Sequence, residues 1–179
     1  MIDADLNWIA SVLQTAPVGV QPPDLKQKVA AISTDSRTIE KGQVFLALRG
    51  PNFDGNKFIA DVKEKGAIAA IVHHPVDIDL PQFVVRDTLK ALGELGAAVA
   101  GEVNAKTIAI TGSVGKTSVK EMCAAILAQK GQVLATKGNF NNEIGVPLTL
   151  LRLEPGHEYA VIELGANHIG EIAYTTQLT

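Results

Sequence analysis

Hydrophobic residues along this chain occur either in short continuous runs or at a spacing of three to four. The continuous runs predict strands at 29–33, 44–48, 67–72, 82–85, 107–110, 132–136 and 159–164. The runs at 44–48, 107–110 and 159–164 are typical of buried strands. The spaced residues predict a first helix that Asp5 caps and that ends before Pro17, and further helices at about 56–65, from about residue 87, after Lys116 and from Pro147. Residues 49–55 are expected to form a glycine-bearing loop. Because strands alternate with helices, we expect an α/β protein whose strands pair in parallel through right-handed crossovers.

The strand pattern stops near residue 85, where a long helix begins. Apolar residues Leu89, Leu92, Leu95 and Val99 lie roughly on one side of that helix. A length of 179 residues leaves room for two small domains. We therefore place a domain boundary here, with a small α/β domain at 1–85 and a second domain at 86–179.

The most informative stretch is TIAITGSVGKTSVKEMCAAILAQ, residues 107–129, which predicts a strand, a glycine loop and a helix. Gly112 and Gly115 allow successive N–H groups to point at one spot at the helix start, which favours phosphate binding. Lys116 is expected to reach the β/γ oxygens and the Thr117 hydroxyl to hold Mg²⁺. Ile110 stands where the general phosphate-loop pattern has glycine, so this is a shorter form. A simple glycine turn explains neither the second glycine nor the Lys-Thr pair.

Two other polar segments follow predicted strands. Residues 34–38, TDSRT, have turn composition and present an arginine at a strand end. Arg37 offers a planar donor fork to a phosphate or carboxylate, and Ser36 adds a hydroxyl. A simple turn is the alternative. Residues 137–147 contain three asparagines within four residues, which either satisfy turns or line a polar ligand; the sequence leaves both open.

Glu163 lies at the end of the predicted strand 159–164, followed by Gly165 and, three residues later, His168. Ligands of open α/β sheets bind at the carboxyl ends of the strands, the same edge as the glycine loop. Glu163 is thus a natural Mg²⁺ partner for Thr117, because Mg²⁺ is held by one or two carboxylates with phosphates and water. A strand-end acid that caps the next helix is the alternative, and a lone histidine is more often a hydrogen-bonding residue than a ligand.

Composition narrows the classes of partner. Sixteen Lys and Arg against nineteen Asp and Glu give a net charge of −3, which argues against a broad nucleic-acid footprint or attraction to an anionic membrane. The single cysteine, Cys123, falls on the apolar stripe of its helix and fits a buried thiol in a reducing compartment. The N-terminus carries acids where a signal peptide has bases, and no apolar run approaches the ~20 residues of a membrane span. We expect a cytoplasmic monomer.

These motifs resemble those of the Mur ligases, the ATP-dependent amide-bond ligases of peptidoglycan precursor synthesis. The matching stretches are Thr111–Thr117 (TGSVGKT), Gly138–Pro147 (GNFNNEIGVP) and Glu163–Ile172 (ELGANHIGEI). The shortened glycine loop is the form that this family uses. Thr34–Arg37 and Phe53–Gly55 also resemble the N-terminal domain of the family, whereas Asn56 stands where relatives often have histidine.

The resemblance implies three domains: one for the UDP end of the substrate, a central ATPase domain, and a C-terminal domain for the incoming amine. The chain stops soon after Glu171, so we expect it to be an N-terminal portion that is inactive alone. Residues 138–147 and 163–172 are most similar to the member that adds D-alanyl-D-alanine to UDP-N-acetylmuramoyl-tripeptide. The implied reaction is attack of a peptide carboxylate on the γ-phosphorus of ATP, followed by displacement of phosphate by the amine.

Carried over residue by residue, the resemblance assigns catalytic roles to Lys116, Glu163 and His168, and Mg²⁺ to Thr117 and Glu163. ATP is expected on Thr111, Gly112, Ser113, Val114, Gly115, Lys116 and Thr117. The UDP-linked substrate is expected on Ser36, Arg37, Asp54, Gly55, Asn139 and Asn142. The alternatives are another ligase of the superfamily, of the folylpolyglutamate or cyanophycin type, and a nucleotide-binding module or switch protein without ligase activity.

Overall fold

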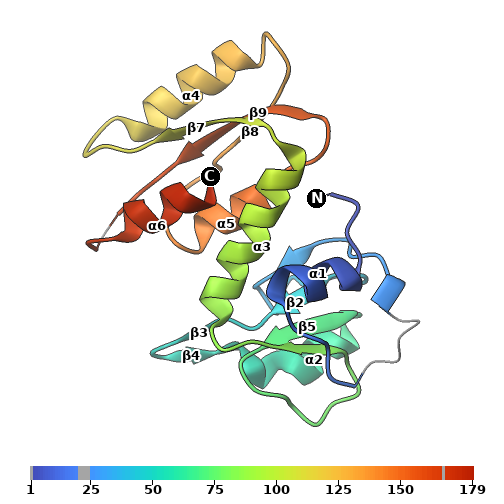
Figure 1. Cartoon of the computed structure of the whole chain (residues 1–179). Helices are drawn as coiled ribbons and strands as arrows, with labels where there is room; N and C mark the ends of the chain where they lie inside the picture. Colours follow the sequence, from blue (N-terminus) through green and yellow to red (C-terminus); the bar gives the residue numbers. More distant parts are fainter. Residues whose placement is uncertain (1, 20–24, 167) are drawn as a thin grey trace. The chain divides into compact units, whose positions relative to one another are not determined.

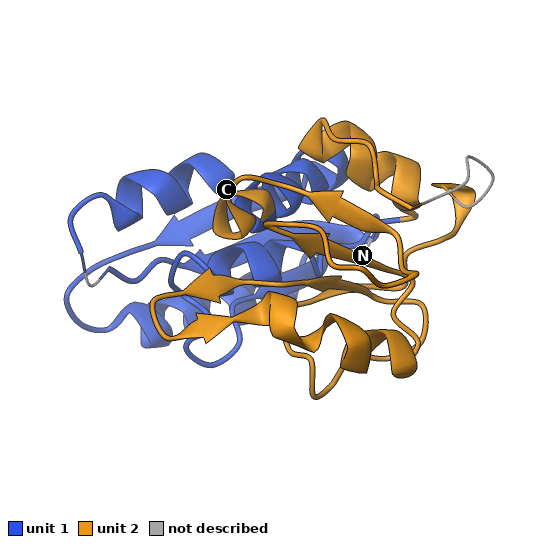
Figure 2. Ribbon diagram, turned by 90° about the horizontal axis from the view of Figure 1, so that it is seen from below, with its two compact units in different colours: residues 1–2, 92–179 blue, residues 3–91 orange. Residues whose placement is uncertain are grey.

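The computed structural model describes residues 2–19, 25–166 and 168–179. The chain forms two compact units, an N-terminal unit of residues 3–91 and a C-terminal unit of residues 92–179 together with residues 1–2 (orange and blue in Figure 2). The division falls inside helix α3 (Thr88–Val103), close to the boundary expected at residues 85 and 86. Both units combine helices with parallel strands, so the predicted α/β class is confirmed.

The N-terminal unit is built on a four-stranded sheet in the order β1-β2-β5-β6, and every pair in it is parallel. The strands are β1 (Ile32–Ser33), β2 (Val44–Leu46), β5 (Ala69–Val72) and β6 (Gln82–Val84). The middle strands β2 and β5 are buried along their whole length, as the continuous apolar run predicts for β2. Phe45 and Val72 of these strands share one apolar cluster with Ile59 and Val62 of the following helix.

Local sequence explains the helices of this unit. Helix α1 (Leu6–Leu13) begins where the Asp5 carboxylate accepts a 2.9 Å hydrogen bond from the Trp8 N–H, the expected cap. The helix predicted at 56–65 is a 3-10 turn, η2 (Gly55–Phe58), followed by α2 (Ile59–Glu64). The segment 49–55, expected as a loop, contains a short antiparallel hairpin of β3 (Arg49–Gly50) and β4 (Phe53–Asp54).

The C-terminal unit has a three-stranded parallel sheet in the order β7-β9-β8. The strands are β7 (Lys106–Ile110), β8 (Gln132–Ala135) and β9 (His157–Glu163), and the helices that follow them are α4 (Lys116–Leu127), α5 (Gly145–Leu150) and α6 (Glu171–Leu178). Figure 1 shows α4 along one face of this sheet and α5 toward the other. No helix among the described residues has the length and apolar character needed to cross a bilayer.

Burial in the C-terminal unit departs from the sequence pattern in two places. Strand β7 was expected to be buried, yet it lies at a sheet edge and Ile108 is 40% exposed. The apolar stripe expected on α4 is also uncovered, since Met122 and Ile126 are exposed and Cys123 is half-buried rather than buried. An apolar pattern predicts a helix or strand face whose burial is favourable, but the tertiary arrangement decides whether a neighbouring element covers that face. Helix α5 begins at Gly145, two residues before the predicted start at Pro147.

Candidate functional site

The glycine loop joins the end of β7 to the start of α4. Gly115 caps α4 with φ at +76°, a backbone conformation that residues with a side chain rarely adopt. The Lys116 side chain folds back over the loop, and its Nζ donates a 2.7 Å hydrogen bond to the carbonyl of Gly112. The lysine charge and the N-terminus of a 12-residue helix therefore face the same small region. This arrangement favours an anion such as a phosphate.

Thr117 and Glu163 meet beside this loop. Glu163 is the last residue of β9 and pairs in register with Ile110, the last residue of β7, so both strands end at the same edge. The Thr117 Oγ1 donates a 2.9 Å hydrogen bond to Glu163 Oε2, and Glu163 is only 3% exposed. A hydroxyl and a carboxylate at a phosphate-binding edge are the hard oxygen donors that Mg²⁺ prefers, so these residues fit that ion.

Asn141 completes the surroundings of this carboxylate. Its Nδ2 donates a 2.9 Å hydrogen bond to Glu163 Oε1, and its carbonyl accepts a 2.7 Å hydrogen bond from the Gly165 N–H. A Cβ atom at Gly165 would lie 2.9 Å from the Asn141 side chain, so the glycine is needed for this approach. The asparagine cluster was a candidate site in the sequence, but the family resemblance assigned Asn139 and Asn142 to substrate binding and left Asn141 out. Nothing in the sequence pattern shows which amide faces Glu163.

The two selected asparagines have other described partners. Asn142 Oδ1 accepts hydrogen bonds from the N–H groups of Gly145 at 2.9 Å and Ile144 at 3.3 Å, which satisfies the start of α5. Asn139 is exposed, and its carbonyl accepts a 2.8 Å hydrogen bond from the Asn141 N–H. The structure thus gives Asn142 a local role in the turn, and contact of either residue with substrate stays a prediction.

His168 lies after β9, and its side chain is 82% exposed. Its Nδ1 is 2.7 Å from Glu171 Oε1, and this hydrogen bond and the carboxylate charge raise the pKa of His168. Within the described hydrogen bonds and ion pairs, His168 is joined to Glu171 and not to Glu163. Its catalytic role stays a prediction. The neighbouring Asn167, part of the motif that carries the family resemblance, lies outside the described residues.

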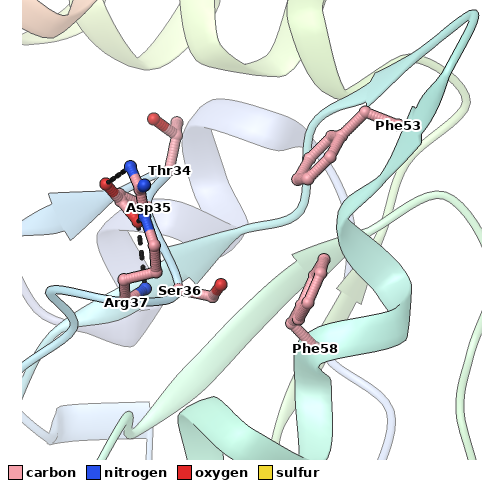
Figure 3. A pocket seen from close by; sticks show the side chains of 6 residues that line it. All are labelled: Thr34, Asp35, Ser36, Arg37, Phe53 and Phe58. Atoms are coloured by element: carbon pink, nitrogen blue, oxygen red, sulfur yellow. Dashed lines mark hydrogen bonds and ion pairs between the residues drawn. The ribbon is translucent and has the colours of Figure 1, made fainter.

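The N-terminal unit contains a pocket of about 460 Å³. Figure 3 shows the polar turn of Thr34, Asp35, Ser36 and Arg37 on one side of it and the rings of Phe53 and Phe58 on the other. The two rings stack with centroids 5.8 Å apart and planes 19° from parallel. The pocket therefore holds the predicted Ser36 and Arg37. The two aromatic residues are an addition, because Phe53 appeared in the sequence only as part of the Phe53–Gly55 segment and Phe58 was not assigned to a site.

The guanidinium of Arg37 is not free to bind an anion with all of its N–H groups, because it is already paired with a carboxylate. Its Nε and Nη2 donate to the two carboxylate oxygens of Asp35 at 2.9 and 2.7 Å, within the same turn. This bidentate pair lowers the pKa of Asp35 to about 2 and raises the pKa of Arg37. The Asp35 carboxylate also accepts a 3.0 Å hydrogen bond from the Arg37 N–H. An anion that binds here must therefore share the guanidinium with Asp35.

Asp54 and Gly55 belong to the segment that connects the two phenylalanines. Asp54 accepts a 3.0 Å hydrogen bond from the Asn56 N–H at the start of η2. Gly55 packs against the backbone directly after β2, because a Cβ at this position would lie 2.7 Å from the Ala47 Cα. Asp54 and Gly55 are not among the residues that line the pocket, although they lie between the two phenylalanines that do. Their contact with substrate stays a prediction. His73 lies close to Asp54, and its Nδ1 is 3.9 Å from Asp54 Oδ1.

Comparison with known proteins matches this chain to two family models. Residues 28–131 match the model described as Mur ligase family, catalytic domain, and residues 110–179 match the Mur ligase middle domain. The chain is 58% identical over 179 residues to UDP-N-acetylmuramoyl-tripeptide--D-alanyl-D-alanine ligase from Escherichia coli. The match covers 100% of this chain and 38% of that relative.

Solved structures agree with the sequence matches. MurF from Acinetobacter baumannii superposes with a TM-score of 0.93 at 44% identity, covering 98% of this chain and 39% of the other. MurF ligase from Thermotoga maritima in complex with ADP gives a TM-score of 0.76 at 33% identity, covering 83% and 35%. The chain thus spans about two fifths of the length of these relatives.

Proposed function

Because this chain belongs to the Mur ligase family, we propose that it supplies the UDP-substrate unit and the phosphate-loop unit of an ATP-dependent ligase. The reaction is the joining of D-alanyl-D-alanine to UDP-N-acetylmuramoyl-tripeptide, which is the activity named for the E. coli relative. The observation that carries the proposal is the meeting of Thr117 and Glu163 beside the glycine loop, at the edge where two parallel strands end.

In the C-terminal unit, Lys116 and the loop N–H groups bind the β- and γ-phosphates of ATP. Thr117 and Glu163 hold Mg²⁺, which offsets negative charge on the phosphates when it is bound. The remaining loop residues that contact ATP are Thr111, Gly112, Ser113, Val114 and Gly115. Catalysis by these groups consists of positioning and charge neutralisation, because phosphoryl transfer needs little covalent help from the protein.

In the N-terminal unit, the pocket between the polar turn and the two phenylalanines holds the UDP end of the substrate. Phe53 and Phe58 offer apolar ring surface to the base. Ser36 and Arg37 donate hydrogen bonds to the diphosphate, and Asp54 and Gly55 fix the wall that carries the rings.

The substrate carboxylate attacks the γ-phosphorus and releases ADP, and the amine of D-alanyl-D-alanine then displaces phosphate from the acyl phosphate. Asn139 and Asn142 contact the substrate near its reacting end, and His168 helps to build the metal or acyl-phosphate site. Such a ligase works in the cytoplasm as a monomer, without a nucleic-acid partner or membrane insertion, in keeping with the net charge of −3.

ATP binding to the chain tests the phosphate-loop unit. Isothermal titration calorimetry with ATP and Mg²⁺ should give saturable binding that Lys116→Ala weakens by roughly 10- to 100-fold, because a charge-assisted hydrogen bond contributes about 1.5–3 kcal/mol. Lys130→Ala, an exposed lysine after α4, is the matched control. Equal affinity of wild type and Lys116→Ala would contradict the proposal.

Ligation itself is tested on the protein at its full natural length, with ATP, UDP-N-acetylmuramoyl-tripeptide and D-alanyl-D-alanine. An amide product detected by mass spectrometry is the expected result. ATP binding without an amide product would favour a nucleotide-binding module. Binding of folates in place of UDP-linked peptides would favour a folylpolyglutamate-type ligase.

A further inference from the structure

Lys120 is a buried cation in the C-terminal unit, only 2% exposed. Its Nζ donates a 2.7 Å hydrogen bond to the carbonyl of Thr136 and lies 2.9 Å from Glu121 Oε1. The Glu121 side chain is itself well exposed. Burying a lysine ammonium is unfavourable unless its partners compensate for the lost water. The partners of the Lys120 ammonium are one backbone carbonyl and one solvent-exposed carboxylate. The position of Lys120 therefore calls for a role beyond packing.

The place of Lys120 on α4 ties it to the phosphate loop. It follows Lys116 by four residues and Thr117 by three, and residues at these spacings lie on the same side of a helix, one turn apart. The Lys120 ammonium thus anchors the turn of α4 directly after the two residues that face the phosphates and Mg²⁺.

Thr136 connects this anchor to Glu163. Thr136 follows the last residue of β8 and is buried. Its N–H donates a 3.0 Å hydrogen bond to the Val161 carbonyl, and its Oγ1 accepts a 2.9 Å hydrogen bond from the Glu163 N–H. A continuous chain of hydrogen bonds therefore runs from the Lys120 ammonium through Thr136 to the backbone of Glu163.

We propose that Lys120 is a positioning residue that sets the place of the Glu163 carboxylate against Thr117, acting through the hydrogen bonds of Thr136. Helix α4 carries Thr117, and strand β9 carries Glu163. Lys120 clamps the helix to the strand end beside Glu163, so it fixes the separation of the two Mg²⁺-binding groups. This role rests on the proposed function of Thr117 and Glu163.

The test compares nucleotide binding with and without Mg²⁺. The probe is ATP, titrated by calorimetry either with excess Mg²⁺ or in EDTA, and the readout is the ratio of the two dissociation constants. Lys120→Met keeps an unbranched apolar side chain and removes the ammonium, and Lys120→Arg restores a charged donor. Lys130→Met is the matched control on an exposed lysine. Urea unfolding measures stability separately.

Lys120→Met should weaken ATP binding in the presence of Mg²⁺ by roughly tenfold, which is the lower range for loss of a group that orients a metal ligand. The dissociation constant of ATP measured in EDTA should change less. Lys120→Arg should recover most of the loss. Thr136→Val removes the Oγ1 acceptor and should produce a similar loss. The double variant Lys120→Met/Thr136→Val should lose little more, because the two groups act in series.

A Mg²⁺ ratio that stays at the wild-type value in both Lys120→Met and Thr136→Val would overturn the proposal, even if stability falls, because it would show a purely structural role. If Lys120→Met does not fold, Thr136→Val and Lys120→Arg decide the question by the same ratio. Wild-type protein that binds no ATP, or binds it equally well after Lys116→Ala, would overturn the proposed function first and this inference with it.

Discussion

The Thr117 hydroxyl donates a hydrogen bond to the Glu163 carboxylate across 46 residues of sequence, at a distance of 2.9 Å. Thr117 stands in the first turn of α4, and Glu163 ends the central strand of the sheet. The contact exists because β7 and β9 are parallel neighbours that end together. It joins the phosphate loop to the acidic strand end as one site.

Glu163→Gln should weaken Mg²⁺-dependent ATP binding by roughly tenfold or more, with little change in EDTA. The glutamine keeps the shape of the side chain and removes the negative charge that attracts the ion. Calorimetric titrations at several Mg²⁺ concentrations measure the effect, with Glu158→Gln on the exposed part of the same strand as the control. An unchanged Mg²⁺ dependence would remove Glu163 from the metal site.

Asn141→Ala should also reduce the apparent Mg²⁺ affinity, by several-fold to roughly tenfold, because it removes the amide that orients Glu163 Oε1. Asn141→Asp places a second carboxylate beside Glu163, and the like charges should raise the pKa of the pair. The Mg²⁺ dependence of ATP binding in Asn141→Asp should therefore become steeper with pH than in wild type. Gln129→Ala, an exposed amide after α4, is the control. Wild-type behaviour of both Asn141 variants would mean that Glu163 needs no orienting amide.

Asp35→Asn should strengthen UDP binding by roughly two- to fivefold, because it removes a negative charge that competes with the diphosphate for Arg37. The gain should shrink as salt is added, since both side chains are solvent-accessible. Arg37→Ala should weaken binding, and Asp61→Asn on α2 serves as the control. Weaker UDP binding by Asp35→Asn would show instead that Asp35 holds the guanidinium in its binding position.

The half-buried His73 should make the protein less stable in mild acid. Burial lowers the pKa of His73 from 6.5, and its Nδ1 has no hydrogen-bond partner among the described residues. The groups that act on its charge are Asp54, which raises the pKa, and His74 and Arg49, which lower it. Below about pH 6.5 the unfolded chain binds a proton that the folded chain binds less readily, so the free energy of unfolding falls as the pH falls.

Urea unfolding at pH 7.5 and at pH 5.5 measures this dependence. One histidine contributes at most about 1.4 kcal/mol per pH unit. His73→Gln should flatten the loss of stability between the two pH values, whereas the exposed His74→Gln should leave it in place. An equally steep loss in His73→Gln would assign the acid sensitivity to other groups.

Much of the fold follows from local sequence. The continuous apolar runs located the buried strands β2, β5 and β9, because strands covered on both faces need apolar side chains at consecutive positions. Asp5 located the start of α1, since a carboxylate at that position satisfies a free backbone N–H. The glycine loop was equally clear, because glycine and the Lys-Thr pair at a helix start report local backbone geometry.

Only the tertiary structure decided which distant residues meet. The exposure of Ile108 and Ile126 depends on what covers β7 and α4, which no local pattern encodes. The choice of Asn141 over its two neighbours depends on how the loop meets β9. The pairing of Arg37 with Asp35 and the clamp from Lys120 to Thr136 depend on side-chain directions and on strand order. The sequence thus determined the elements and the phosphate loop, and long-range packing decided how Glu163 is held against Thr117.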